Sequence, residues 1–167
     1  MRTPLLGALG LACGAAIGAA AALRRAGAAG ARAAREVVAA RPRATVRGIR
    51  GAITVPADEA GAILSATAEL LLAIVARNGL DSRDVAAALF TVTPDLSSEF
   101  PAAAARAIGW TQVPLLNFTE IGVPGRLARV IRCLVLVNSG RGQDEVDHVY
   151  LGEATTLRPD LASRSAQ

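Results

Sequence analysis

The sequence predicts an α+β domain in which helices cover one face of a β-sheet, in the order βαβαβ followed by a hairpin-like pair. Three observations support this fold class. Residues 46–167 contain short β-branched segments, two segments with helical spacing, and turn residues between them. No internal repeat is visible, and 167 residues suffice for a single core, so we expect one fold and one site.

The domain is predicted to begin with a strand and a long helix. The strand covers residues 45–55, where β-branched side chains alternate with others, and it ends before Pro56. Asp58 is the expected N-cap of a helix over residues 59–77, and Gly79 lies in its stop signal. One apolar face of this helix consists of Ile63, Thr67, Leu70, Leu71, Ile74 and Val75.

A second strand and a short helix follow. Asp81 or Ser82 is expected to cap a short turn, and a buried strand is predicted over residues 85–93, before the turn at Pro94. An alanine-rich helix is predicted over residues 101–108, because proline is favoured in the first turn of a helix.

Three strands complete the prediction. They cover residues 112–118, residues 131–138 and approximately residues 146–151. A loop with glycine, proline and a helical turn near Arg126 separates the first two of these strands. A polar turn over residues 139–143 joins the last two, which are expected to form the hairpin-like pair.

Charge is distributed unevenly along the chain. Residues 1–45 carry seven Arg and one Glu, whereas residues 46–167 carry eleven Arg and thirteen acidic side chains. The domain is therefore slightly acidic, although the whole chain has a net charge of +4. Nucleic-acid binding requires a basic face, and often aromatic stacking platforms, so we do not expect a nucleic-acid partner.

Few side chains are available for cofactor chemistry. The chain has no Lys, and its only His is His148. Cys13 and Cys133 lie in unrelated contexts, which indicates neither a disulfide framework nor metal spacing. We therefore expect no cofactor, no metal and a reducing compartment, with His148 in a structural role.

Residues 1–45 form an Ala/Arg-rich leader with three possible interpretations. Residues 3–23 are uncharged and long enough to cross a bilayer, but Ala and Gly insert weakly. The leader is a secretory signal, a membrane anchor, or a dispensable or misassigned extension. The arginines after residue 23 would keep the domain in the cytoplasm, which is the predicted location. Contact with a membrane is expected only if the leader is a membrane anchor. Alternative start positions are Val37, Val38 and Val46.

Short motifs in residues 46–167 resemble one enzyme family in series and in order. They are Arg47-Gly48-Ile49-Arg50-Gly51-Ala52, Thr93-Pro94-Asp95-Leu96, Phe100-Pro101-Ala102, Gly109-Trp110, Val113-Pro114, Glu120, Arg132, His148-Val149-Tyr150-Leu151 and Leu157-Arg158-Pro159-Asp160-Leu161. With this set, the chain resembles the AroH-class chorismate mutases. The resemblance implies a mixed βαβαββ sheet, a homotrimeric pseudo-barrel with active sites between subunits, and conversion of chorismate to prephenate in phenylalanine and tyrosine biosynthesis.

This reaction is an intramolecular pericyclic shift that needs no nucleophile, proton carrier or metal. An enzyme accelerates it by holding the reactive conformer and by placing positive charge near the ether oxygen, where negative charge develops. Arginine suits both tasks, because its guanidinium is permanently charged and its fork of donors matches a carboxylate.

Motif positions imply four catalytic residues. Arg132 is expected to donate to the ether oxygen, Arg50 and Tyr150 to bind a substrate carboxylate, and Glu120 to hold the ring hydroxyl. Each also has an ordinary structural interpretation, such as a strand-end charge, a core tyrosine or a solvated loop carboxylate. Further expected substrate contacts are Phe100, Arg106, Asn117, Leu157 and Arg158.

The sequence departs from the family pattern near the site. Leu116 and Asn117 stand where Thr and Cys are frequent, and Ala103 replaces a position that is commonly basic at the entrance. One residue is missing between Arg106 and Trp110. We expect activity to survive these changes with a poorer apparent affinity.

Two other classes of function compete with this prediction. A non-catalytic trimeric small-molecule binder or a Rid-type imine deaminase is the alternative, and a membrane-associated regulatory subunit would rest on the leader alone. The joint presence of Arg50, Glu120, Arg132 and Tyr150 favours a monofunctional mutase, because a generic anion binder does not need all four.

Overall fold

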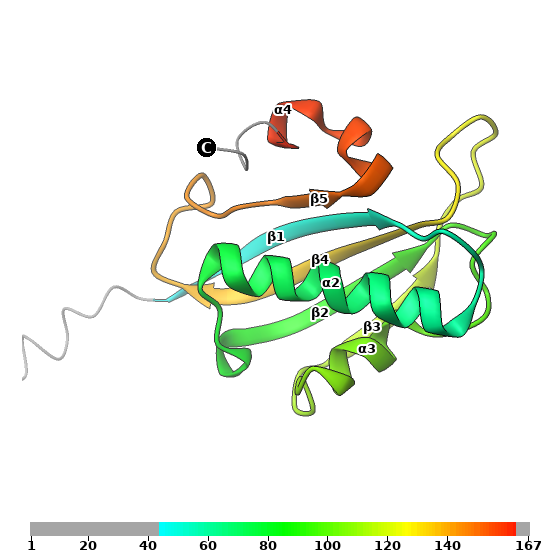
Figure 1. Cartoon of the computed structure of the whole chain (residues 1–167). Coiled ribbons are helices and arrows are strands. Elements are labelled where there is room, and N and C mark those ends of the chain that lie inside the picture. Colours follow the sequence, from blue (N-terminus) through cyan, green and yellow to red (C-terminus); the bar gives the residue numbers. More distant parts are fainter. Residues whose placement is uncertain (1–43, 163–167) are drawn as a thin grey trace, which may run out of the picture. The chain divides into compact units, whose positions relative to one another are not determined.

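The computed structural model describes residues 44–162, so the predictions for the leader lie outside the described residues. Helices α2 and α3 lie on one face of a five-stranded sheet (Figure 1). The elements in order are β1 (Thr45–Thr54), α2 (Ala60–Asn78), η1 (Ser82–Asp84), β2 (Val85–Val92), α3 (Pro101–Ala107), β3 (Leu115–Thr119), β4 (Val130–Ser139), β5 (Val149–Leu151), η2 (Gly152–Leu157) and α4 (Pro159–Ala162). The α+β class is confirmed, and five strands are present, as the element-by-element prediction has it, whereas the βαβαββ order implied by the resemblance has four.

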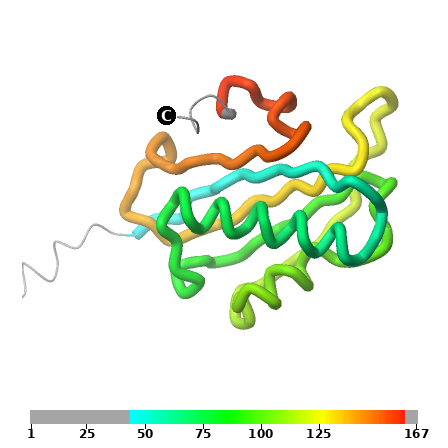
Figure 2. Tube along the Cα trace, viewed as in Figure 1, coloured from blue at the N-terminus to red at the C-terminus, as the bar shows by residue number. Residues whose placement is uncertain are grey.

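The sheet is mixed, and its strand order is β3-β2-β4-β1-β5. Strand β4 pairs antiparallel with both β1 and β2, while β5 is parallel to β1 and β3 is parallel to β2. The predicted hairpin-like pair is therefore wrong. Both edges of β4 are occupied, so the chain crosses after β4 to the free edge of β1 and then runs back along β5 (Figure 2).

Alternation along β4 separates two faces of the sheet. Ile131, Cys133, Val135 and Val137 are buried in the core, whereas Leu134 is exposed. The second face, here called the open face, carries the side chains that alternate with the core positions. Its residues on β2, β3 and β4 are Leu89, Thr91, Leu116, Phe118, Arg132, Leu134 and Leu136.

Helix α2 covers the core face, and its predicted apolar side is confirmed. Ile63, Leu70 and Ile74 are fully buried, and Gly79 ends the helix in the left-handed conformation, with φ 62°. By length and composition alone α2 could cross a membrane, but its apolar side is already used by packing against the sheet. The close approach of α2 to the sheet depends on Gly51 of β1, where a Cβ would lie 2.8 Å from Ile74 Cδ1.

Asp58 does not cap α2, contrary to prediction. Glu59 occupies the N-cap position and makes no side-chain capping bond. The Asp58 carboxylate instead accepts hydrogen bonds from the backbone N–H groups of Ser97, at 2.8 Å, and Ser98, at 2.9 Å. These bonds lower the pKa of Asp58 and tie the start of α2 to the segment before α3.

Two strand boundaries differ from prediction because other groups take the pairing positions. Strand β3 begins at Leu115, since Pro114 has no N–H to donate, although its carbonyl accepts from Ala88 N at 2.9 Å. Strand β5 begins only at Val149, because the buried Asn78 amide bonds both the N–H and the carbonyl of Asp147. Near Arg126, where a helical turn is predicted, the chain makes a turn in which Arg126 N–H donates to Val123 O at 3.3 Å.

Candidate active site

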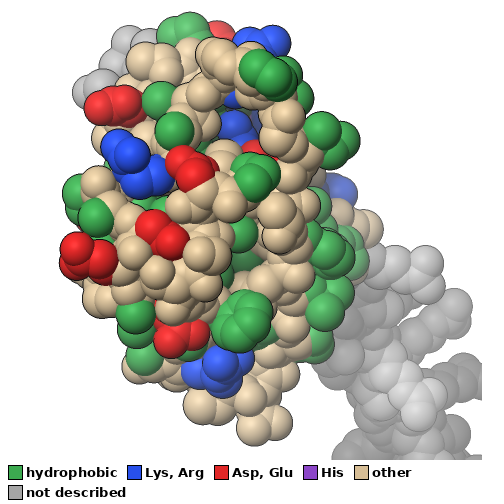
Figure 3. All heavy atoms as spheres, turned by 90° about the vertical axis from the view of Figure 1, so that its right-hand side faces the viewer, with side chains coloured by type: hydrophobic (Ala, Val, Ile, Leu, Met, Phe, Trp, Pro, Cys, Tyr) green, Lys and Arg blue, Asp and Glu red, His purple; other side chains and the backbone are tan. Residues whose placement is uncertain are grey.

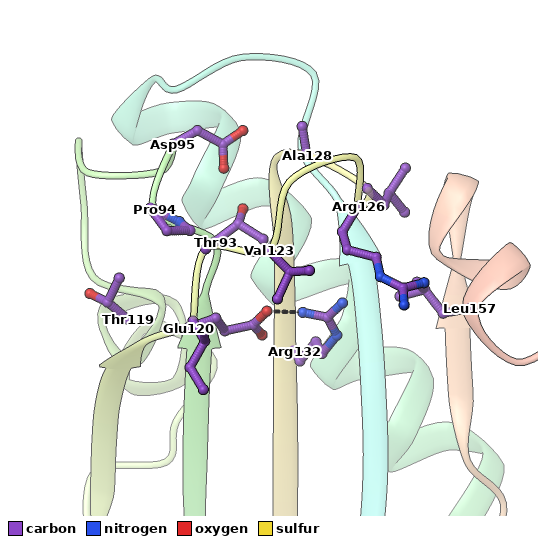
Figure 4. Close-up of a pocket in the computed structure, with 13 residues that line it drawn as sticks. Thr93, Pro94, Asp95, Thr119, Glu120, Val123, Arg126, Ala128, Arg132 and Leu157 are labelled. Atoms are coloured by element: carbon purple, nitrogen blue, oxygen red, sulfur yellow. Dashed lines mark hydrogen bonds and ion pairs between the residues drawn. The ribbon is translucent and has the colours of Figure 1, made fainter.

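A cavity of about 720 Å³ lies at one end of the open face, where the loop after β3 meets η2. It is lined by residues from the ends of β2, β3 and β4, from that loop and from η2 (Figure 4). Figure 3 views this end of the molecule and shows basic side chains inside a hollow that hydrophobic side chains border. The chain contains no Lys, so these basic groups are arginines.

An arginine–carboxylate pair forms the centre of the cavity. Arg132, on β4, donates from Nη1 to Oε2 of Glu120, and both residues are partly buried (Figure 4). Glu120 follows β3 directly, and its backbone N–H donates to Val92 O at 2.8 Å, which fixes the start of the loop. Two of the predicted catalytic residues are thus brought together from strands that are not neighbours in the sheet.

The prediction did not include Thr91, which also contacts Glu120. Its hydroxyl donates to Glu120 Oε1 at 2.5 Å. Thr91 lies opposite Arg132 in the register of β2 and β4, and opposite Phe118 in the register of β2 and β3. From the sequence, the alternation of side chains along a strand could have predicted that Thr91 shares a face with Leu89. That Thr91 lies beside Glu120 follows only from the pairing of β2 with β3 and β4.

Arg50 and Tyr150 lie farther along the same face. Ala52 of β1 pairs with Arg132 on one side and with Tyr150 on the other, so these three residues form a row across the sheet. Arg50 is exposed and borders a smaller cavity of about 240 Å³. Tyr150 packs against the small buried cluster that contains Ala52 and Ala154.

His148 supports the backbone of Arg50. The Arg50 N–H donates to His148 Nδ1 at 3.1 Å, which requires that this nitrogen carry no proton. Burial lowers the pKa of His148, and the nearby positive charges of Arg50 and Arg158 lower it further. A neutral imidazole at this position is consistent with the predicted structural role.

The C-terminal segment contributes one residue to the main cavity. Leu157, at the end of η2, lines it together with Leu127 and Arg126. Arg158 instead forms an ion pair with Asp160, with 2.6 Å between Nη2 and Oδ2. Its charge is therefore partly balanced before any substrate binds.

Besides Arg158, three predicted substrate contacts do not line the main cavity of the single chain. Phe100 is 66% exposed at the start of α3, and Arg106 is exposed near the end of the same helix. Asn117 lies on β3, and its Oδ1 accepts from Ala102 N at 3.1 Å, which anchors α3 to the sheet. These residues form a separate group around α3 and β3.

Cys133 lies behind the site, on the core face. Desolvation raises the pKa of its thiol to about 12, so the side chain is a protonated, buried thiol at neutral pH. Among residues 44–162 there is also no group of three His, Cys, Asp or Glu side chains arranged to hold a metal ion.

Comparison with known proteins identifies the family. The family model for chorismate mutase type I matches residues 46–161. This chain belongs to the type I chorismate mutases. It is 59% identical over 119 residues to chorismate mutase AroH of Thermus thermophilus, covering 71% of this chain and 98% of the relative.

Two further chorismate mutases support the assignment. Chorismate mutase AroH of Bacillus subtilis is 42% identical over 118 residues, which cover 70% of this chain and 93% of the relative. The solved structure of chorismate mutase Cth-682 from Clostridium thermocellum aligns with a TM-score of 0.64 at 42% identity. That alignment covers 65% of this chain and 97% of the solved chain.

Membership in the chorismate mutases establishes the activity. The protein is an isomerase that converts chorismate to prephenate in aromatic amino-acid biosynthesis. The binding-module and imine-deaminase alternatives are not favoured.

Proposed function

We propose that the Arg132–Glu120 pair performs the central step of chorismate rearrangement. The observation that supports this role is the position of both side chains inside one cavity on the open face. The Arg132 guanidinium is available to donate to the ether oxygen, where negative charge grows as the bond breaks. The Glu120 carboxylate accepts from the ring hydroxyl and orients the ring, without acting as a base.

Arg50 and Tyr150 complete the proposal as carboxylate ligands. Tyr150 continues the row that runs from Arg132 through Ala52 across the sheet, and Arg50 lies two residues before Ala52 on β1, opposite Leu134. A guanidinium and a phenol at this position together offer several donors to a substrate carboxylate. Leu157 supplies an apolar wall, and Arg158 is a second cation close to Tyr150.

A homotrimer with active sites between subunits is also part of the proposal. The open face exposes Leu116, Phe118 and Leu134 beside Arg132, and side chains of this size are rarely left uncovered together on a monomer. Covering this face with neighbouring subunits would bury it. The separate group of Phe100, Arg106 and Asn117 would then complete the cavity of a neighbour.

This arrangement predicts that two inactive variants restore each other. Arg132→Ala should inactivate one side of the shared site, and the double variant Phe100→Ala/Arg106→Ala the other. After co-refolding in equal amounts, roughly a quarter of the sites should combine two intact sides and recover activity, because a cyclic trimer joins each subunit to the next. Chorismate consumption before and after mixing measures the recovery.

Mixing Arg132→Ala with Glu120→Ala is the matched control. Both changes affect the same side, so this mixture should stay inactive. No recovery in the first mixture, with trimers present, would mean that each site is built within one chain.

Arg126 is proposed as an additional cation for the dianionic substrate. It lines the cavity beside Leu157 in Figure 4, and no carboxylate of residues 44–162 forms an ion pair with it. Ala103 supplies no charge at the entrance, so Arg126 is placed to compensate.

Replacing Arg126 with Gln is therefore expected to raise KM about five- to tenfold and to leave kcat nearly unchanged. The reason is that the Arg126 guanidinium would stabilise the bound substrate and the transition state equally. Steady-state kinetics at two salt concentrations test this, since removing the charge should also weaken the salt dependence of kcat/KM. Arg77→Gln, at the exposed end of α2, removes the same charge away from the cavity and should change neither parameter. A KM equal to that of the unmodified enzyme would contradict the role.

A cytoplasmic location remains part of the proposal. It rests on the arginines that follow the apolar stretch of the leader, by the positive-inside rule.

A further inference from the structure

We infer that Thr91 is a positioning residue that holds the Glu120 carboxylate in its working orientation. This inference rests on the proposed role of Glu120 as the ligand of the ring hydroxyl. The motifs that identify the family do not include Thr91, and its role follows from where the sheet places it.

The Glu120 carboxylate is held by two donors from different strands. Oε1 accepts from the Thr91 hydroxyl at 2.5 Å, and Oε2 accepts from the Arg132 guanidinium. Strand β2, which carries Thr91, lies between β3 and β4 in the sheet. The carboxylate is thus held from β2 on one oxygen and from the neighbouring strand β4 on the other.

The two donors differ in stiffness. Thr91 is β-branched, so few side-chain rotamers are available and its hydroxyl is placed by the strand itself. Arg132 is long, and in the proposed mechanism it must also donate to the ether oxygen. While Arg132 is engaged with substrate, Thr91 keeps Oε1 in place, and a carboxylate has enough lone pairs to accept the ring hydroxyl as well.

A purely structural role would not require this hydroxyl. The neighbours Phe90 and Val92 face the core, and Phe90 is fully buried there. Thr91 points to the opposite side, onto the open face, where the described chain gives its hydroxyl one acceptor, Glu120. An apolar residue of the same shape would therefore preserve the strand and lose only the contact with the carboxylate.

The test is a double-mutant cycle between Thr91 and Glu120. Thr91→Val should lower kcat about tenfold with little change in melting temperature, because a hydrogen bond to a charged group is lost. Thr91→Ser retains the hydroxyl and should recover to within about threefold of the unmodified enzyme. In a Glu120→Gln background, Thr91→Val should cost less than about twofold, because the acceptor it orients has been altered.

Two results would overturn the inference: an equal loss for Thr91→Val in both backgrounds, or a Ser variant as slow as the Val variant. Thr45→Val makes the same exchange at the exposed start of β1 and should leave the rate unchanged. A Glu120→Gln enzyme with full activity would instead contradict the proposed role of Glu120, so the two failures are distinguishable.

Discussion

Replacement of Arg132 with Ala is expected to lower kcat and kcat/KM by at least about 1,000-fold, with the assembly intact. Loss of one preorganised donor to a developing oxyanion typically costs about 100- to 1,000-fold, and here the donor is also charged. Because the contact strengthens as the ether bond breaks, both parameters should fall together while KM changes little. Chorismate disappearance, with prephenate identified as product, measures the effect.

Two comparisons separate this effect from a general loss of structure. Arg132→Lys retains a charge but cannot reproduce the planar fork of donors, so it should remain strongly impaired. Arg77→Ala removes an exposed arginine at the end of α2 and should have normal kinetics. Near-normal turnover of a folded Arg132→Ala enzyme would rule out the proposed role.

Replacing Gly51 with Val is expected to lower the free energy of unfolding by about 3 kcal/mol, at the upper end of the usual cost of overpacking a core. A Cβ at this position would lie 2.8 Å from Cys133 Sγ and 2.8 Å from Ile74 Cδ1. These atoms belong to β4 and α2, so the side chain would push the helix away from the sheet. Urea denaturation followed by far-UV circular dichroism measures the change.

Gly61→Ala is the matched control for this prediction. Its added Cβ meets nothing within 4 Å, and the position is helical. Stability should be unchanged or should rise by up to about 1 kcal/mol, because Ala favours the helix over Gly. A Gly51→Val protein with unchanged stability would mean that α2 can shift at no cost.

Local patterns predicted most elements correctly. The helical spacing of Ile63, Leu70 and Ile74 identified α2, and Gly79 identified its end, because both signals depend on neighbouring residues. The β-branched segments located β1, β2 and β4 to within about two residues, an accuracy usual for boundaries. The errors at Asp58 and at the start of β5 arose where distant groups, Ser97 and Asn78, supplied the hydrogen bonds.

For the active site, the sequence and its resemblance to the family predicted an arginine for the ether oxygen and a carboxylate for the hydroxyl, and these two roles stay predictions. Only the tertiary structure decided which residues meet: Thr91 joins Glu120 and Arg132, whereas Phe100 and Arg106 stay apart from them. The physical reason is that strand pairing is non-local. The strand order and the register depend on hydrogen bonds between backbone groups that lie far apart in the chain. A shift of one residue in the register of a strand would turn each of its side chains to the other face of the sheet.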